Sequence, residues 1–176
     1  AEECPGFTKV FVEALEETSR NLPEDLHICG LSWGPITTAG YCMGVENMLM
    51  ATMFGEGDTV KKLVTKVTDL VSAMQRRMID AVMWMADPTS SADIISPDMF
   101  TEYSEDHIRK VVEDVKAVDD VPTFAHICGN TLNIIEPLKR THADCLSFDH
   151  AVDINRAKEL AGRDIALMGN LDPVEL

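Results

Sequence analysis

Two residues of types that bind zinc stand two positions apart in the segment Ala125–Thr131, which reads AHICGNT. Side chains at alternate positions of a strand point to the same face, and histidine and cysteine are common zinc ligands, so His126 and Cys128 could share one metal ion. Gly129 and the polar residues after it predict the end of a strand, where α/β folds place their active sites. A catalytic zinc needs three protein ligands, so the pair alone leaves ordinary packing open as the alternative.

The same pattern occurs once more, as His27-Ile28-Cys29-Gly30. Joined, the two pairs would supply the four ligands of a closed, structural His2Cys2 zinc site. Such a site requires neighbouring strands, whereas a strand predicted at Val82–Ala86 lies between them in a sheet that follows the order of the sequence. We therefore expect His27 and Cys29 to serve ordinary packing, in line with the preference of cysteine for buried positions.

Polar side chains also follow other predicted strands. Asp87 and Asp149 each come directly after an apolar run, and Asn170 and Asp172 follow the last predicted strand. An acid at a strand end can ligate a metal or act as a general acid or base. Alternatively, these side chains cap the loops and turns after the strands, an interpretation that a chain with 30 acidic residues favours.

Predicted strands and helices alternate along the chain. Helical spacing of apolar residues predicts helices from Pro5-Gly6-Phe7 to before Pro23, over Ile36–Phe54, from Asp58 to about Asp80, from Ser96 to about Val118, from Thr131, and from Ile154 or Asn155. Short apolar runs predict strands at Leu26–Leu31, Val82–Ala86, Thr123–Cys128, Cys145–Phe148 and Ile165–Met168. Because strands that alternate with helices form a parallel sheet covered by helices, the predicted fold class is α/β.

The length of the chain restricts the architecture. A closed eight-stranded (β/α) barrel normally takes about 250 residues and rarely fewer than ~200. This chain has 176 residues and five predicted strands. It is therefore too short for a complete barrel, and we expect either an open α/β sheet or part of a barrel.

Composition restricts the partners and the compartment. Fifteen basic residues against 30 acidic ones give a net charge of −15, which argues against nucleic acid or an anionic membrane as a partner. No apolar run approaches the ~20 residues of a membrane-spanning helix, and the first residues lack the basic and apolar regions of a signal peptide. Five scattered cysteines fit reduced thiols or metal ligation better than secreted disulfides. We therefore expect a cytoplasmic protein.

Several segments together resemble a known family. In this order, the uroporphyrinogen decarboxylase superfamily is matched by Gly34-Pro35, Gly44-Val45-Glu46, Ala86-Asp87-Pro88-Thr89, Ile95–Phe100, His126–Asn130, Phe148-Asp149 and Gly169–Pro173. Within this superfamily, the chain is most similar to the methylcobamide:coenzyme M methyltransferases. The decarboxylases share the aspartate strand and the Gly-Asn-Leu-Asp-Pro segment, but only the methyltransferases carry His-x-Cys-Gly-Asn, which is their zinc motif.

The resemblance implies an architecture and a reaction. It covers nearly the whole chain but only the middle and later part of a family barrel. Residues 1–176 would therefore be part of a single catalytic domain of the (β/α)8 TIM-barrel type, with about five βα units and without the family's amino-terminal region and carboxyl-terminal end. The implied reaction transfers a methyl group from methylcobamide, carried by a corrinoid protein, to a thiol such as coenzyme M.

The resemblance also implies roles for individual residues. His126 and Cys128 would bind Zn²⁺, and Asp149 lies where related enzymes place an acidic ligand that gives way to substrate, which makes it a metal-binding and catalytic candidate. The third family ligand, a cysteine near the carboxyl terminus, is not among these residues. Zinc would activate the substrate thiol, because the thiolate is the nucleophile. The candidates for binding the corrinoid around the barrel mouth are Asp87, Asn130, Asn170 and Asp172.

Two other functions stay open. A decarboxylase that acts on porphyrinogen carboxylates needs arginines near its substrate. All the arginines of this chain fall on predicted helices or their ends, at Arg20, Arg76, Arg77, Arg109, Arg140, Arg156 and Arg163. A non-catalytic fragment that binds a corrinoid or a partner protein would have the fold without a complete metal site. Metal content separates these alternatives from the methyltransferase.

Overall fold

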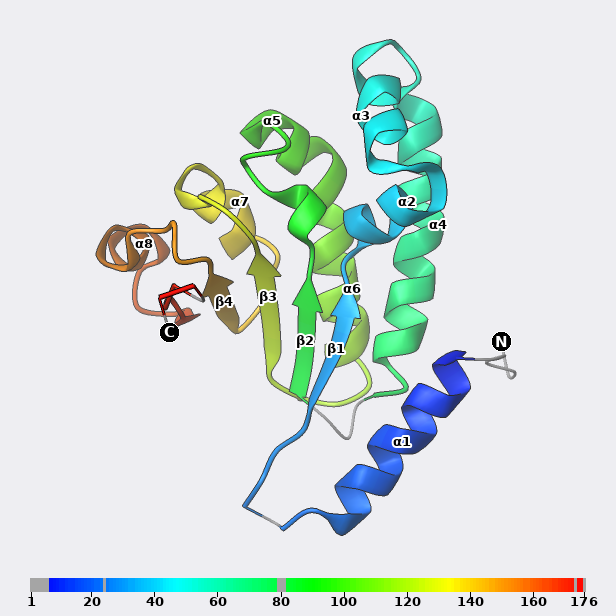
Figure 1. Cartoon of the computed structure of the whole chain (residues 1–176), viewed down its shortest axis with the longest axis vertical. Coiled ribbons are helices and arrows are strands. Elements are labelled where there is room, and N and C mark those ends of the chain that lie inside the picture. Colours follow the sequence, from blue (N-terminus) through cyan, green and yellow to red (C-terminus); the bar gives the residue numbers. More distant parts are fainter. Residues whose placement is uncertain (1–6, 24, 79–81, 173, 176) are drawn as a thin grey trace.

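One parallel sheet forms the centre of the molecule (Figure 1). The structure, a computed structural model, describes residues 7–23, 25–78, 82–172 and 174–175. In that part of the chain the strands follow one another in sequence order, as β1 Cys29–Trp33, β2 Val82–Ala86, β3 Thr123–Ile127, β4 Cys145–Phe148 and β5 Ala166–Met168. All four neighbouring pairs are parallel. The predicted α/β class and sequential order are confirmed.

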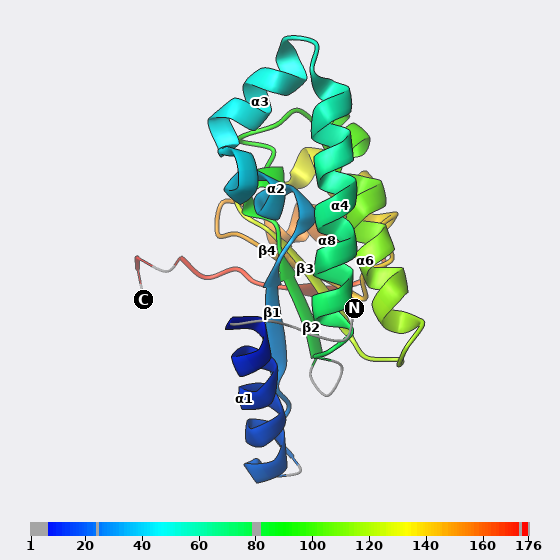
Figure 2. The same ribbon diagram turned by 90° about the vertical axis from the view of Figure 1, so that its right-hand side faces the viewer.

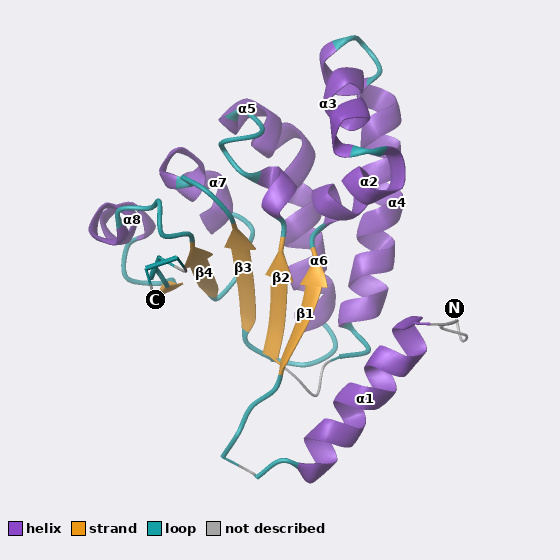
Figure 3. Ribbon diagram, in the orientation of Figure 1, coloured by secondary structure: helices purple, strands orange, loops and turns teal. Residues whose placement is uncertain are grey.

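One helix precedes β1, and the others connect successive strands. They are α1 Phe7–Asn21, α2 Pro35–Met43, α3 Val45–Met53, α4 Gly57–Gln75, α5 Pro97–Phe100, α6 Asp106–Lys116, α7 Ile135–Lys139 and α8 Ile154–Ala161. A π-helical turn, Thr101–Glu105, joins α5 to α6. In Figure 3 the arrows of β1 to β4 all point toward the end of the sheet where α3 and α5 lie. Among the described helices, none combines the length and apolar character that crossing a membrane requires.

Two predicted helices are divided. Gly44 has φ +86, a backbone conformation that favours glycine, and it splits the helix predicted over Ile36–Phe54 into α2 and α3. The helix predicted from Ser96 contains the π turn between α5 and α6, so it is not one regular α-helix. Its predicted start is confirmed, because the Ser96 hydroxyl accepts the N–H of Met99 as an N-cap.

Several predicted boundaries differ by a few residues. β1 begins at Cys29 rather than at Leu26. α4 ends at Gln75, before the predicted end near Asp80, and residues 79–81 lie outside the described residues. The predicted opening of the first helix at residues 5–6 also lies outside them.

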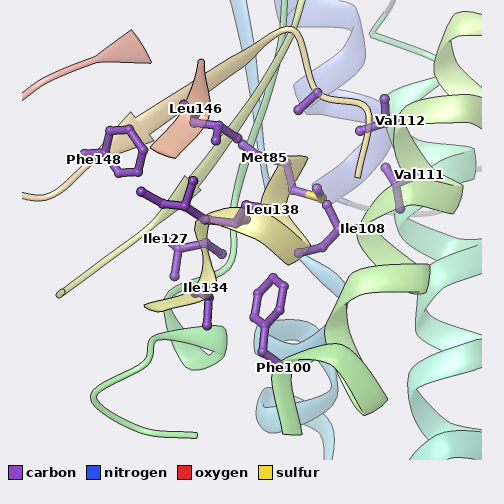
Figure 4. Close-up of a cluster of buried hydrophobic side chains, with 14 of the residues drawn as sticks. Met85, Phe100, Ile108, Val111, Val112, Ile127, Ile134, Leu138, Leu146 and Phe148 are labelled. Atoms are coloured by element: carbon purple, nitrogen blue, oxygen red, sulfur yellow. The ribbon is translucent and has the colours of Figure 1, made fainter. Parts of the chain in front are cut away.

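Helices cover one face of the sheet, and the opposite face, the bare face, is exposed on β1, half-buried on β2 and β3 and buried on β4. Side chains of β1 alternate between exposed and buried, and those of β2 and β3 mostly alternate between half-buried and buried. Figure 2 shows α4 and α6 on one side of the strands. The buried side chains of the strands pack with residues of α6, α7 and α8 in one core cluster (Figure 4). This cluster includes Met83, Met85, Ile108, Val111, Ala125, Ile127, Leu138, Leu146 and Ala157. The opposite face carries Leu31, Trp33, Trp84, Phe124 and His126.

Candidate metal centre

The structure brings the two predicted zinc ligands together at the carboxyl end of β3. His126 is half-buried on the bare face, and Cys128 follows directly after the strand. Nε2 of His126 and Sγ of Cys128 are 3.4 Å apart. A tetrahedral zinc ion about 2.0–2.1 Å from a nitrogen and about 2.3 Å from a sulfur places these two ligands about 3.6 Å apart. The pair is therefore spaced to bind one zinc ion.

Ser147 on β4 fixes the orientation of the His126 ring. The two residues lie opposite each other in the β3–β4 register. Nδ1 of His126 lies 3.2 Å from the carbonyl oxygen of Ser147 and 3.1 Å from its hydroxyl oxygen. A carbonyl oxygen only accepts, so Nδ1 carries the proton and the lone pair of Nε2 is left for a metal. Sequence reasoning missed Ser147 because the register between strands is not visible in the sequence.

The thiol of Cys128 requires a nearby positive charge to ionise at neutral pH. Burial raises the pKa of this thiol, and the negative charge of Asp149 raises it further. A protonated thiol is a poor metal ligand and a poor nucleophile. A bound cation reverses this balance by stabilising the thiolate. The electrostatics of the pair therefore fit a zinc ion.

Asp149 lies beside the pair, but its carboxylate is occupied by other donors. One oxygen accepts the N–H of Gly129 over 3.1 Å, and the other accepts the N–H of Ala151 over 3.0 Å. These hydrogen bonds lower the pKa of Asp149, with a further contribution from His150. Among residues 7–23, 25–78, 82–172 and 174–175, no group of three histidine, cysteine, aspartate or glutamate side chains is placed to hold a metal. Asp149 thus holds the turn after Cys128.

Asp87 lies in the interior of the fold, not at the rim of the barrel mouth where the sequence analysis placed it. Its side chain is 1% exposed. The carboxylate accepts the backbone N–H groups of Ile36 and Thr37 over 3.2 and 2.7 Å, and the Thr37 hydroxyl over 2.6 Å. Burial raises the pKa of Asp87, and the hydrogen bonds from Thr37 and Ile36 oppose that rise. The reason for the difference is that the first turn of α2 supplies these donors and draws the carboxylate inward.

The two predicted asparagines support loops at the same end of the sheet. Oδ1 of Asn130 accepts the N–H of Leu132 over 3.2 Å. Nδ2 of Asn170 donates to the carbonyl oxygen of Asp149 over 3.1 Å and to that of Val152. These contacts correspond to the loop-capping interpretation of strand-end polar residues. Asn130 is exposed and Asn170 is half-buried.

Asp172 is linked to Asp149 through His150, a residue that sequence reasoning missed. Nδ1 of His150 lies 2.8 Å from Oδ1 of Asp149, and its Nε2 lies 3.9 Å from Oδ2 of Asp172. Asp93, from the loop after β2, was also missed, although its carboxylate accepts the N–H of Asn130 over 3.1 Å. His150 directly follows Asp149 at the end of β4, so its place in the sequence could have indicated it, whereas only the folded loops reveal Asp93.

The second His-x-Cys pair lies apart from the first. β2 stands between β1 and β3, so the predicted separation of the two pairs is confirmed. The expected packing role is wrong, because His27 and Cys29 are both exposed. The physical reason is that Cys29 lies on β1, an edge strand whose alternate side chains point to the bare face, and His27 lies before that strand.

Comparison with known proteins relates the whole chain to one family. The family model for uroporphyrinogen decarboxylase (URO-D) matches residues 2–176. The chain is 28% identical over 174 residues to a methylated-thiol–coenzyme M methyltransferase of Methanosarcina mazei, covering 97% of this chain and 46% of the relative. It is 30% identical over 172 residues to the methylcobamide:CoM methyltransferase MtbA of the same species, covering 96% and 50%. A uroporphyrinogen decarboxylase of Crocosphaera subtropica is 25% identical over 181 residues, covering 98% and 49%.

A solved structure has the same fold. It is a methyltransferase from Methanosarcina mazei, with a TM-score of 0.85 and 25% sequence identity, and the match covers 93% of this chain and 48% of the other. The chain spans about half the length of the curated relatives it matches. The predicted partial (β/α) barrel, with about five βα units, is confirmed. By sequence and fold, the chain belongs to the uroporphyrinogen decarboxylase family.

Proposed function

We propose that this chain is part of a zinc-dependent methyltransferase, which moves a methyl group from a methylated corrinoid protein to a thiol such as coenzyme M. The observation that carries the proposal is the distance of 3.4 Å between Sγ of Cys128 and Nε2 of His126, the nitrogen whose lone pair is left for a metal. Relatives named methylcobamide:CoM methyltransferases, at 26–30% identity, support the choice of substrates.

The chain's own residues prepare the chemistry. A bound zinc ion supplies the positive charge that keeps a substrate thiol ionised at neutral pH. His126 and Cys128 would hold this ion, and Ser147 orients the imidazole so that Nε2 lies beside Sγ of Cys128. The thiolate sulfur attacks the methyl carbon, so that a carbon–sulfur bond forms while the cobalt–carbon bond breaks. The electron pair of the broken bond stays with the corrinoid, and the thiol proton leaves to solvent.

Other residues at this end of the sheet have proposed roles. Asp149 stays a candidate for the acidic ligand and catalytic group, since it lies close enough for its charge to affect the Cys128 thiol. Asn130, Asn170 and Asp172 stay candidates for corrinoid contacts at the barrel mouth. Asp87 is omitted from this set because it is enclosed. The cytoplasmic location and the lack of nucleic-acid and membrane partners stay predictions.

A decarboxylase is the second candidate function. Uroporphyrinogen decarboxylases are 25–26% identical to this chain, so family membership alone is compatible with either reaction. The paired imidazole and thiol favour the methyltransferase. These groups are suited to binding a metal such as zinc, and the decarboxylation of a porphyrinogen has no evident need for one. A non-catalytic corrinoid-binding protein is the third alternative.

Zinc content tests the proposal first. Elemental analysis of the full-length protein is expected to give about one zinc ion per chain, held by His126, Cys128 and a third protein ligand, because a catalytic zinc needs three. Cys128→Ala and His126→Ala should each lose the metal. Cys42→Ala is the matched control, because Cys42 is an exposed cysteine on α2. Zinc in the wild type and the control, but not in the other two variants, supports the site.

A methyl-transfer assay tests the reaction. The zinc-loaded protein is mixed with methylcobalamin and coenzyme M, and loss of the methylated corrinoid is followed by absorbance. Turnover that disappears in Cys128→Ala supports the methyltransferase. A wild-type protein without zinc and without turnover contradicts it, in favour of a decarboxylase-like or non-catalytic chain.

A further inference from the structure

Two carboxylates from different loops hold the turn that contains Cys128. The N–H of Gly129 donates to Oδ2 of Asp149, and the N–H of Asn130 donates to Oδ2 of Asp93, each over 3.1 Å. β3 ends directly before Cys128, so the turn has left the hydrogen-bond ladder of the sheet. The two carboxylates take the place of a neighbouring strand as acceptors for the turn's amide groups.

Asp93 belongs to a loop after β2 that is itself fixed. Its own N–H donates to the hydroxyl of Ser91 over 3.2 Å, and Ser91 is buried. The carbonyl oxygen of Ser91 accepts the N–H groups of Ile94 and Ile95, both over 2.9 Å. These bonds fix the loop backbone that carries Asp93 beside the Cys128 turn.

Gly129 allows the two loops to come into contact. A Cβ atom at this position would lie 2.0 Å from Oδ2 of Asp93 and 2.7 Å from Oγ of Ser91. Its φ of +75 also lies in the left-handed region that favours glycine. The absence of a side chain at Gly129 therefore leaves the space that the Asp93 carboxylate occupies.

We propose that Asp93 is a positioning residue for the metal pair. It fixes the backbone of the Gly129–Asn130 turn, so that Sγ of Cys128 stays beside Nε2 of His126. The metal part of this inference rests on the proposed function, whereas the fixed turn exists without metal. Removing an outer partner of a ligand typically weakens metal binding by about 10–100-fold.

Co²⁺ binding measures the effect on the site. Asp93→Ala removes the acceptor, while Asp93→Asn keeps an oxygen that can accept the N–H of Asn130. Titration against a chelator, followed by thiolate–cobalt absorption, should show about 10–100-fold weaker binding for Asp93→Ala and near wild-type binding for Asp93→Asn. Asp98→Ala is the control for lost charge, because Asp98 is an exposed acid in the nearby α5.

Amide hydrogen exchange, followed by NMR on metal-free protein, tests the turn independently. The Asn130 amide should exchange faster in Asp93→Ala than in the wild type. Gly129→Ala should have the same effect, because the added methyl group displaces the carboxylate. Gly162→Ala is the control for backbone conformation: φ is +82 there, and a Cβ would meet open space.

The outcomes separate the two proposals. Unchanged Asn130 exchange in Asp93→Ala overturns the positioning role, whether or not metal binds. Equal loss of Co²⁺ affinity in Asp93→Ala and Asp93→Asn also overturns it, since charge alone would then explain the effect. A wild-type protein that binds no Co²⁺ contradicts the proposed function, while faster Asn130 exchange in Asp93→Ala still supports the fixed turn.

Discussion

The ionisation of Cys128 depends on one neighbouring carboxylate. Burial raises the pKa of the thiol, and the charge of Asp149 adds to the rise. Asp149→Asn removes the negative charge, so the thiol pKa should fall while the contribution of burial remains. At a fixed neutral pH, metal-free Cys128 should then react faster with iodoacetamide, because a larger fraction of the thiol is ionised.

Mass spectrometry of the alkylated peptide measures this rate separately from the other cysteines. Cys42, exposed on α2, provides the internal control, and its rate should be the same in both proteins. An unchanged rate at Cys128 would mean that Asp149 does not act on the thiol through its charge.

For single residues, the sequence indicates which side chains could take part in chemistry but not which residues they contact. His126 and Cys128 are found from their types and spacing, because alternate positions of one strand share a face. Ser147 is found only from the register of two strands, and Asp93 only from the contact of two loops. Asp87 has the expected type and strand-end position, yet the donors of α2 enclose it.

The junction of β1, α2 and β2 depends on a buried carboxylate. Asp87 at the end of β2 satisfies two N–H groups in the first turn of α2. Asp87→Ala leaves both donors buried without this acceptor, and it should lower the free energy of unfolding by about 2–5 kcal/mol. Asp87→Asn should cost less, because the amide oxygen still accepts the N–H of Thr37.

Urea unfolding followed by circular dichroism measures this difference. Gly34→Ala tests the same junction from the opposite side, since its Cβ would lie 2.4 Å from Cβ of Asp87. Equal stability of the wild type and Asp87→Ala would show that α2 does not depend on this carboxylate.

Asp144 ties the start of β3 to the end of α6 and makes this part of the fold sensitive to pH. Partial burial acts to raise the pKa of Asp144, but hydrogen bonds from Lys116 and Thr123 outweigh it and lower the pKa below its ordinary value of 3.8. A carboxylate with a lowered pKa stabilises the folded state above its ordinary pKa, and this contribution is lost as pH falls through the lowered value.

Asp144→Asn should therefore be less stable than the wild type at pH 7, by less than about 1 kcal/mol because the Asp144 side chain is 46% exposed. The stability difference between the two proteins should shrink as the pH falls below about 4, the ordinary pKa of an aspartate. Urea unfolding midpoints of both proteins, measured at about pH 7, 5 and 3, give the comparison. A difference independent of pH would rule out the carboxylate charge as its source.

The sequence predicts elements well where one signal dominates. Apolar runs bounded by polar residues predict β2 and β4 at their observed bounds, and the N-cap of α5 follows from a serine before a proline. The break at Gly44 depends on φ, and the π turn before α6 depends on how that helix packs on its neighbours. Neither is set by local propensity, so neither could be predicted.

The bare face of the sheet gives the 176-residue chain a large apolar surface. Leu31 and Trp33 are 48% and 46% exposed, and the rings of Trp84 and Phe124 stack 5.5 Å apart beside them. A groove of about 290 Å³ along the β1 edge extends this surface toward Tyr41. In a closed barrel the corresponding face forms the interior, where side chains fill the space. In an open sheet the same face is an apolar surface exposed to water, which is unfavourable.

A polypeptide that consists of these 176 residues alone should therefore self-associate through this face. Its two tryptophans, Trp33 and Trp84, both lie there, so their fluorescence reports whether the face is covered. Dilution should convert larger species to smaller ones in sedimentation velocity, and acrylamide should quench the tryptophans more strongly in the dilute sample. Leu31→Lys should weaken association, because it places a charge on the face.

Val118→Lys is the matched control for this substitution. Val118 is a similarly exposed apolar residue after α6, on a different part of the molecule, and a lysine there should leave association unchanged. A monomer at every concentration, with tryptophans that acrylamide quenches freely, would show that the face stays open to water. Equal weakening by both lysine variants would contradict association through this face, because net charge cannot explain it: each lysine reduces the magnitude of a net charge of −15 and so reduces self-repulsion.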